Sequence, residues 1–510
     1  MFACGDSRLP PGTFIVKKRG QKRENVFSPC LAEGIIMGET KSREQLIHEA
    51  AMKIMETTGV AIVNKKAVEI LKANGIRVED NVAYFTEEQV WHWVKKAPES
   101  FTIYARDPKH NVTVGGEHVN PVPTYGCAFI DDWEGNRRPG TMADYIQCLK
   151  MVEEEEVYDV NGGILVQPSD IPEESAALSM FYAMLTHSEK AMLFPTGYKE
   201  EVSLILEASS EIFGGKEALI EKPRMIALIN TVSPLTLDER MLDCLMQLVD
   251  YGQPVILCPA SMLGATSPVF YAGSLASNTA EDLAGICLAQ MIRPGTPVVF
   301  GIQSTAADMR GGITFACASP EGTVMQGFST NMAKFYGLPS RGGGCQTDAP
   351  RINVQAGYES MLTLFSSFHH GINFVMEAGG VMDSVNATCF EKMVIDYEII
   401  REVKAALAPI EINEETLDLD EITEVGHTGT YVTSDSTMEN FSLLYSPVIG
   451  SRNAKDEHYL KASIDKAIEK LLKKYEDHRP GIGQEDRAKV KAIFAKSGMD
   501  VERLNQIDAM

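Results

Sequence analysis

In this 510-residue chain, the passage best suited to chemistry is LPSRGGGCQTDAPRINVQAGYES, residues 338–360. Three consecutive glycines stand at its centre: Gly342, Gly343 and Gly344. Arg341 precedes them, and Gln346 and Asp348 follow. Glycine allows a backbone to approach a ligand closely and to adopt positive φ. The passage therefore predicts either the floor of a roomy pocket or tight packing at a corner of the fold. The polar residues that follow at once favour the pocket.

A second group of candidate residues closes a series of short apolar runs, such as RMIALINTVSPL, TPVVFGIQSTAAD and INFVMEAGG. Glu377 is the main acid of this group. The others are uncharged polar residues: Gln167, Thr196, Asn230, Ser233, Ser261, Gln303 and Ser304. Each of them could instead satisfy the backbone of its own loop. We expect Gln303 and Glu377 to line one site together with the glycine segment.

Metal-ligand patterns are missing from the sequence, which contains no HxH, HExxH or Cys/His cluster at ligand spacing. His369 and His370 are adjacent, and neighbours on a helix diverge by about 100°. One of them could contact a substrate carboxylate, although a core or surface role is commoner. The sequence also lacks a GxSxG motif and a P-loop. We expect no bound metal and no directly bound cofactor.

Composition excludes further classes of function. The chain carries 47 Lys+Arg against 70 Asp+Glu, a net charge of -23, which argues against nucleic acid and anionic membranes as partners. The ten cysteines form no CxxC pair and several lie in apolar runs, so we expect buried free thiols and a cytoplasmic protein. No window of about 18 apolar residues predicts a membrane span. Aromatic residues are sparse at 8%, but one near a strand end, such as Phe365, could face a cation.

The elements that position these residues follow from hydrophobic periodicity. Residues 41–100 have the pattern of three helices, and a region with turn signals up to about residue 140 predicts hairpins. From residue 141, apolar strands alternate with helical stretches, which predicts parallel strands joined by crossover helices. The number and length of these units favour a (β/α)8 TIM barrel, with an open doubly wound sheet as the alternative. Without a GxGxxG motif, a dinucleotide-binding version of the latter is disfavoured.

Four regions are expected along the chain. Residues 1–40 form a leader, and residues 41–140 form a helical and hairpin extension. Residues 141–450 form the catalytic barrel, and residues 451–510 form charged helices packed on it. A barrel carries its chemistry at the C-terminal ends of its strands, which is where the candidate residues fall. We also expect a homo-oligomer, with the N-terminal helices or the charged C-terminal helix as its interface.

The sequence resembles the trimethylamine methyltransferase superfamily, in particular its branch without pyrrolysine that includes glycine betaine methyltransferases. The resemblance rests on GLPSRGGGCQTDAPRINVQAGYES, HHGINFVMEAGG, INTVSPLTLDERMLDCL and GNRRPGTMADY, and it extends from the N-terminal helices to about residue 450. It implies a (β/α)8 barrel that transfers a methyl group from an amine to the cobalt of a separate corrinoid protein, in one-carbon metabolism of the methanogenic or acetogenic type. Only standard residues occupy the glycine segment, which points away from trimethylamine itself.

The chemistry implied by the resemblance suits these residues. A quaternary ammonium already carries a good leaving group, so displacement by cobalt(I) needs no general acid and no metal ligand. The implied substrates are glycine betaine, proline betaine, carnitine and γ-butyrobetaine. Glu377 or Asp348 would balance the ammonium charge, and Arg341, His369 or Gln346 would bind the carboxylate.

Structural roles remain open for two of these residues. Arg341 could anchor its loop to a neighbouring acid, and Asp348 could cap the helix that follows Pro350. Two other functions also remain open. One is a lyase or hydrolase that uses Glu377 and Asp348 as an acid/base pair, and the other is a non-catalytic protein that binds or senses betaines.

Overall fold

A computed structural model describes residues 41–310, 312–454, 456 and 458–510. The expected leader, residues 1–40, lies outside the described residues, as do Cys4 and Cys30. The eight cysteines that are described are buried and free, as expected. Among the described residues, no helix combines the length and apolarity that crossing a bilayer requires.

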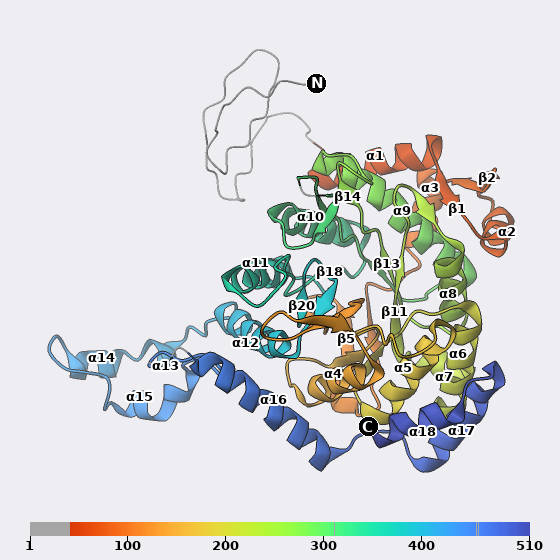
Figure 1. Ribbon diagram of the computed structural model, residues 1–510. Helices are drawn as coiled ribbons and strands as arrows, with labels where there is room; N and C mark the ends of the chain where they lie inside the picture. Colours follow the sequence, from red (N-terminus) through yellow and green to blue (C-terminus); the bar gives the residue numbers. More distant parts are fainter. Residues whose placement is uncertain (1–40, 311, 455, 457) are drawn as a thin grey trace, which may run out of the picture. The chain divides into compact units, whose positions relative to one another are not determined.

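Eight short parallel strands form the centre of the fold (Figure 1). In chain order they are β6 (Asn120–Pro121), β9 (Val160–Gly162), β10 (Ala191–Leu193), β11 (Met225–Asn230), β13 (Val255–Cys258), β15 (Val298–Phe300), β18 (Arg341–Gly343) and β19 (Phe374–Met376). β9 to β15 pair in sequence order, a parallel bridge from Phe300 to Ser340 continues to β18, and β19 pairs with both β18 and β6. The Gly126 N–H donates to Ile164 O, which joins the segments after β6 and β9. The fold is a (β/α)8 barrel.

A helix follows each strand of the ring. These helices are α4 (Met142–Glu154), α5 (Glu173–His187), α6 (Lys199–Phe213), α8 (Glu239–Asp250), α9 (Tyr271–Ile292), α10 (Pro320–Tyr336), α11 (Val354–His370) and α12 (Phe390–Ala406), with the short α7 (Lys216–Glu221) between α6 and β11. The expected strand at the glycine segment is present as β18. The first strand, β6, lies before residue 141, because Asn120 and Pro121 pair with Phe374 and Val375 of β19.

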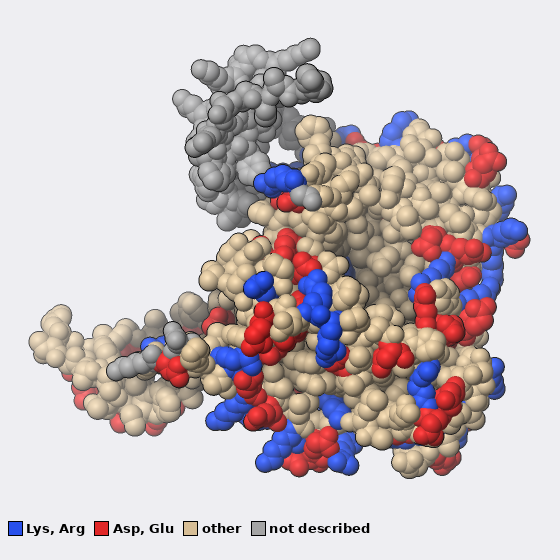
Figure 2. Space-filling model, viewed as in Figure 1, with Lys and Arg blue, Asp and Glu red and all other residues tan. Residues whose placement is uncertain are grey.

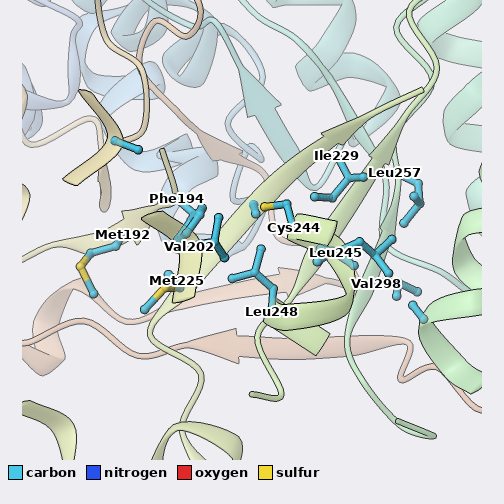
Figure 3. Packing of buried hydrophobic residues seen from close by; sticks show 14 of the residues in the cluster. Met192, Phe194, Val202, Met225, Ile229, Cys244, Leu245, Leu248, Leu257 and Val298 are labelled. Carbon is cyan, nitrogen blue, oxygen red and sulfur yellow. The ribbon is translucent and has the colours of Figure 1, made fainter. Parts of the chain in front are cut away.

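Side chains alternate between two apolar layers along each strand, as the period of two requires. On β11, Ile226 and Leu228 belong to the cluster inside the ring. Met225 and Ile229 belong instead to the larger cluster between the strands and the helices. Figure 3 shows the outer layer, where Phe194, just after β10, and residues of β10, β11, β13 and β15 pack on Val202 of α6 and on α8. The strand residues are Met192, Met225, Ile229, Leu257 and Val298, and the residues of α8 are Cys244, Leu245 and Leu248.

A hairpin closes one end of the ring. Its strands are β4 (Ser100–Ile103) and β5 (Val112–Gly115), and Ile103, Val112 and Val114 join the cluster inside the barrel. The Tyr104 N–H donates to Pro223 O at 2.7 Å, directly before β11 begins. Since the hairpin covers the N-terminal ends of the strands, the opposite, C-terminal end is the mouth of the barrel.

The N-terminal layer packs mainly on α9. It contains the three expected helices, α1 (Arg43–Thr57), α2 (Lys65–Ala73) and α3 (Glu87–Val94), with β1 (Val60–Ile62), β2 (Arg77–Glu79) and β3 (Val82–Tyr84) between them. Thr86 caps α3 as expected. Because this layer covers the outer side of α9, nearly the whole of that helix is buried.

Loops at the mouth carry further short strands, most of them in small sheets of their own, whereas β12 (Thr236–Leu237) pairs with β1 of the N-terminal layer. They contain β7 (Phe129–Asp131), β8 (Arg137–Pro139), β12 (Thr236–Leu237), β14 (Met262–Leu263), β16 (Thr305–Asp308), β17 (Thr314–Ala316), β20 (Val381–Met382) and β21 (Ala387–Thr388). After α12 come the short helices α13 (Glu414–Leu417), α14 (Leu419–Val425) and α15 (Asp435–Asn440). The chain ends with α16 (Tyr459–His478), α17 (Gln484–Phe494) and α18 (Val501–Ala509). α16 packs against α4 and α12, as expected for a charged helix docked on the barrel.

Candidate active site

Four of the predicted site residues meet at the mouth ends of three neighbouring strands. Arg341 opens β18, Glu377 follows β19, Gln303 follows β15 and Gln346 lies in the turn after β18. The Arg341 guanidinium donates to Glu377 Oε1 at 2.6 Å and also donates to Gln303 Oε1. Gln346 Nε2 donates to Glu377 Oε2 at 3.5 Å. We call these four side chains the mouth cluster.

The mouth cluster is buried and almost neutral in charge. Arg341 is 2% exposed and Glu377 is 5% exposed. Burial raises the pKa of Glu377, and the neighbouring Arg341 opposes that shift by favouring the carboxylate. An isolated buried charge would be costly, whereas this pair compensates each ion with the other.

Two polar atoms of the cluster have no hydrogen-bond partner among the described residues. They are Nε of Arg341, which is a donor, and Oε1 of Gln346, which is an acceptor. Most buried polar groups in proteins are paired, so an unpaired donor and an unpaired acceptor in one cluster call for an explanation. A small ligand that brings an acceptor to Nε of Arg341, and either a donor or a positive charge to Oε1 of Gln346, would satisfy them.

Glu377 has an unusual backbone conformation, with φ at 52°. The left-handed region is unfavourable for residues other than glycine, by about 1 kcal/mol or more. The neighbouring backbone fixes this conformation, since Gly344 N–H donates to Met376 O and Ala378 N–H donates to Val122 O at 2.8 Å. Strained backbone of this kind concentrates at functional sites.

Tyr125 and Cys258 lie at the top of the apolar cluster inside the ring. Cys258 Sγ lies 3.5 Å from Nη1 of Arg341. The Tyr125 hydroxyl lies 3.3 Å from Thr196 Oγ1, and burial raises the pKa of this tyrosine to about 12. The barrel therefore offers an aromatic ring and a thiol beneath the mouth cluster. Tyr125 was not among the predicted site residues.

The glycine triplet does not form an open pocket floor. A Cβ on Gly342 would lie 2.5 Å from Ile372 Cδ1, and one on Gly343 would lie 2.5 Å from the Gln346 amide. On Gly344 it would lie 2.5 Å from the Ala378 backbone. The space above each glycine is thus filled by protein, which is the tight-packing alternative. The glycines act by letting Gln346 fold back over β18.

Asp348 is held away from the mouth cluster by loop contacts. Its carboxylate accepts from Ser384 Oγ at 2.8 Å, from the Cys317 thiol at 3.2 Å and from the Ala318 N–H at 3.3 Å. It does not cap α11, whose N-cap is Asn353. These bonds join three mouth loops, and they do not support an acid/base pair of Asp348 with Glu377.

Phe365 and His369 lie elsewhere as well. Their rings stack on one another at 6.1 Å on the exposed outer face of α11. The face of the same helix that points to the barrel carries Ser360, Thr363 and Ser367. The four-residue spacing that pairs Phe365 with His369 places both on the solvent side. The structure therefore does not bring these two predicted residues to the mouth cluster.

The turn after β18 is supported from behind by a buried ion pair. Lys392 Nζ donates to Asp396 Oδ2 at 2.6 Å and to Ser360 Oγ at 2.8 Å, and both charged side chains are fully buried. Asp396 also accepts from the Gly380 N–H at 2.7 Å. Ser360 in turn donates to Cys345 O, so α12 holds the turn that carries Gln346.

The other strand-end residues divide between a cavity and loop contacts. Gln167 and Thr196 line a cavity of about 410 Å³ between the mouth ends of β9 and β10, which Arg240 also lines. Ser261 and Ser304 bond to one another at 2.9 Å. The remaining two are Ser233, which donates to Glu281, and Asn230, which is exposed. Among the described residues, no group of three or more His, Cys, Asp or Glu side chains is placed to hold a metal ion.

Comparison with known proteins gives a consistent result. The sequence profile described as trimethylamine methyltransferase (MTTB) matches residues 17–477. A glycine betaine methyltransferase of Desulfitobacterium hafniense is 36% identical over 468 residues, which cover 91% of this chain and 97% of that protein. A proline betaine:corrinoid methyltransferase of Eubacterium limosum is 30% identical and covers 78% of this chain and 83% of its own length.

One solved structure supports the fold. The monomethylamine methyltransferase of Methanosarcina barkeri superposes with a TM-score of 0.50 at 12% sequence identity, over 85% of this chain and 86% of that one. At this identity the likeness concerns the fold alone.

Proposed function

Because the chain belongs to the trimethylamine methyltransferase (MTTB) family, we propose that it transfers a methyl group from a small betaine to the cobalt of a corrinoid on a separate protein. Two of the relatives act on betaines by name, and one of those names includes the corrinoid. The candidate substrates are glycine betaine and its relatives proline betaine, carnitine and γ-butyrobetaine.

The observation that carries this proposal is the neutral, buried pair of Arg341 and Glu377 with unpaired atoms beside it. A betaine is a zwitterion with a quaternary ammonium at one end and a carboxylate at the other. Its two charges match the two charges of the pair. A purely cationic amine would instead require an acid that Arg341 does not neutralise.

The residues have separate tasks in this proposal. Nε of Arg341, which has no partner among the described residues, donates to the substrate carboxylate. The carboxylate of Glu377 faces the ammonium, which is electrostatically strong in a site that excludes water. The ring of Tyr125 adds a cation–π contact of about 0.5–2 kcal/mol. Because the hairpin closes the other end of the ring, the corrinoid protein approaches from the mouth.

The transfer itself is an in-line displacement. The methyl carbon accepts the electron pair of cobalt(I) as the C–N bond breaks, and that bond's pair leaves with nitrogen as a neutral tertiary amine. No proton moves, so no general acid or base is required. The protein contributes by binding, by orientation and by exclusion of water. This matches a mouth cluster that contains one neutralised acid and no second free one.

The test combines the purified chain with its corrinoid protein reduced to cobalt(I). We expect the cobalt(I) absorbance to decay to that of methylcobalt with at least one betaine, and far more slowly with tetramethylammonium, which lacks a carboxylate. No decay with any quaternary amine would refute the proposal. A betaine that raises the unfolding temperature without methyl transfer would indicate the non-catalytic alternative.

A further inference from the structure

The segment of residues 408–447, which we call the acidic arm, has no buried residue. It contains α13, α14, α15 and a 3-10 turn, Phe441–Leu443, and Figure 1 shows its helices beyond α12 and α16. Eleven of its large apolar side chains are exposed: Ile410, Ile412, Leu417, Leu419, Ile422, Tyr431, Val432, Met438, Phe441, Leu443 and Leu444. Such a density of exposed apolar residues marks an interaction surface rather than an ordinary monomer surface.

The base of the acidic arm is firmly attached to the barrel. Glu398 of α12 accepts hydrogen bonds from the Val448 N–H at 2.8 Å and the Ile449 N–H at 2.9 Å. The hydroxyl of Tyr445 donates to the other oxygen of the same carboxylate. The C-terminal end of the arm is therefore held at a fixed point on α12, which lowers the entropy cost of presenting the arm to a partner.

The arm also has a one-sided charge. It holds nine acidic residues and neither lysine nor arginine: Glu411, Glu414, Glu415, Asp418, Asp420, Glu421, Glu424, Asp435 and Glu439. In Figure 2 the arm is tan and red for the most part. A partner must combine apolar surface with positive charge to be complementary to it.

The same chain carries such a surface on α16. Lys466, Lys470 and Lys473 are spaced by four and three residues, so they lie on one face of that helix. All three are exposed, and none forms an ion pair with another described residue. We call them the lysine stripe. Beside it, between α12, α16 and the C-terminal end of α4, lies a groove of about 290 Å³ whose lining includes Val394, Ala467, Leu471 and Lys470. Glu154, Glu155 and Glu156 also line it, and the first two are paired with Lys474 and Arg401.

The position of the arm distinguishes between two possible partners, the corrinoid protein and a second copy of this chain. α12 begins at the mouth, after Glu377, and runs back along the barrel, so its C-terminal end lies at the closed end of the ring. The arm leaves from that end, whereas a protein that brings cobalt to the substrate must sit over the mouth. The corrinoid protein is therefore not the partner that this surface fits.

We propose that the acidic arm of one copy docks on the lysine stripe and groove of a second copy, in a reciprocal two-fold dimer. Figure 1 shows the helices of the arm leading directly into α16 at one edge of the barrel, so each copy presents both surfaces at that edge. A two-fold axis then pairs arm with stripe twice, which closes the assembly. This inference does not depend on the proposed methyl transfer.

The test measures mass and dissociation by multi-angle light scattering and sedimentation of the full chain. We expect wild type at twice the chain mass of 56.0 kDa. The triple variant K466E/K470E/K473E should raise the dissociation constant at least about tenfold, which corresponds to 1.4 kcal/mol. The double variant L443S/L444S in the arm should do the same. The control K65E/K66E/K72E reverses three exposed lysines of α2 and should leave the dimer intact.

Each other outcome overturns the proposal. A monomeric wild type does so, as does a dimer that survives either the stripe or the arm variant. A monomer whose arm variant raises the KM for the corrinoid protein would assign the arm to that partner. Carbodiimide coupling in a mixture of isotope-labelled and unlabelled chains gives an independent readout, because arm–α16 cross-links must join different copies. Circular dichroism of every variant checks that the fold is retained.

Discussion

At the scale of single residues, the side chains of the mouth cluster hold one another in place. Arg341 donates to both Gln303 and Glu377, and it keeps one N–H for a ligand. Glu377 reaches this position only because its backbone takes a positive φ. Each side chain is thus constrained by the others, which is the preorganisation that a displacement reaction needs from its protein.

The two acids proposed from the sequence, Glu377 and Asp348, can be separated by substitution. We expect Glu377→Gln to lower kcat/KM for glycine betaine by about 10- to 100-fold, since a contact with a charged group contributes roughly 1.5–3 kcal/mol. Asp348→Asn should change kcat/KM by much less, because its carboxylate binds only loop donors. Steady-state rates at saturating corrinoid protein measure both. Equal losses in the two variants would restore the acid/base hypothesis.

The glycine triplet gives a second test. Gly343→Ala places a methyl group 2.5 Å from the Gln346 amide, so we expect a stability loss of about 1–3 kcal/mol from overpacking together with a raised KM for the betaine. The matched control is Gly357→Ala in α11, where nothing lies within 4 Å of the added carbon. It should stabilise the protein by roughly 0.5–1 kcal/mol. Urea unfolding of both variants, with KM values, decides whether the space above Gly343 is filled.

The sequence identified the central residues of the mouth cluster because strand ends in a barrel are predictable. Gln303, Gln346 and Glu377 follow from that rule, because each comes after the end of a strand. Arg341 is the first residue of β18, and only its long side chain reaches Gln303 and Glu377. The sequence could not tell inward from outward positions on a helix, so Phe365 and His369 were placed in the site although both are exposed. Nor could it decide what fills the space beside a glycine, because that depends on residues distant in sequence, such as Ile372 and Ala378.

At the scale of elements, the long strands could be predicted from the sequence, whereas the shortest one could not. β11 has six residues and a clear apolar run, whereas β6 is only Asn120–Pro121. Proline cannot donate to a sheet and usually argues against a central strand. Pro121 is tolerated here at the last position of a very short strand. Because the sequence did not reveal β6, Tyr125, which lies four residues after the end of that strand, was not connected with the mouth.

The docking of the C-terminal helices should depend on pH. His187 of α5 lies 2.6 Å from the Tyr475 hydroxyl and 3.0 Å from Ile507 O, so it joins α16 and α18 to the barrel. Burial lowers the pKa of His187 from 6.5 to about 4. Below pH 6.5 the unfolded chain therefore binds a proton that the folded chain does not. The free energy of unfolding should fall as pH drops from about 6.5 to 4, by up to about 3 kcal/mol.

Denaturant titrations across this pH range measure the slope. His187→Gln is the control, because an amide can donate to Ile507 O and accept from Tyr475 without titrating. Its unfolding free energy should lose this part of the pH dependence. A slope that is the same in both proteins would show that other groups cause it.

At the scale of the whole molecule, the barrel has two ends with different tasks. The hairpin β4–β5 closes one end with apolar contacts, and the acidic arm leaves the barrel on that side. The loops after β13 and β15 extend the mouth, where the described residues Val269, Phe270, Met309 and Ile313 are more than half exposed. In a protein with a net charge of -23, these apolar side chains are the part of the mouth suited to contact with another protein.

If the corrinoid protein docks over the mouth, these loops should contribute to its binding. We expect Phe270→Ser and Met309→Ser each to raise the KM for the corrinoid protein by about tenfold, the effect of losing a contact of roughly 1–2 kcal/mol at an interface. The KM for the betaine should stay unchanged, because neither residue belongs to the mouth cluster. Leu362→Ser removes an exposed apolar side chain from the outer face of α11 and serves as the control. Initial rates over a range of corrinoid-protein concentrations measure the effect. A change in the KM for the betaine alone would contradict the prediction, because it would show that these loops contact the substrate and not the corrinoid protein.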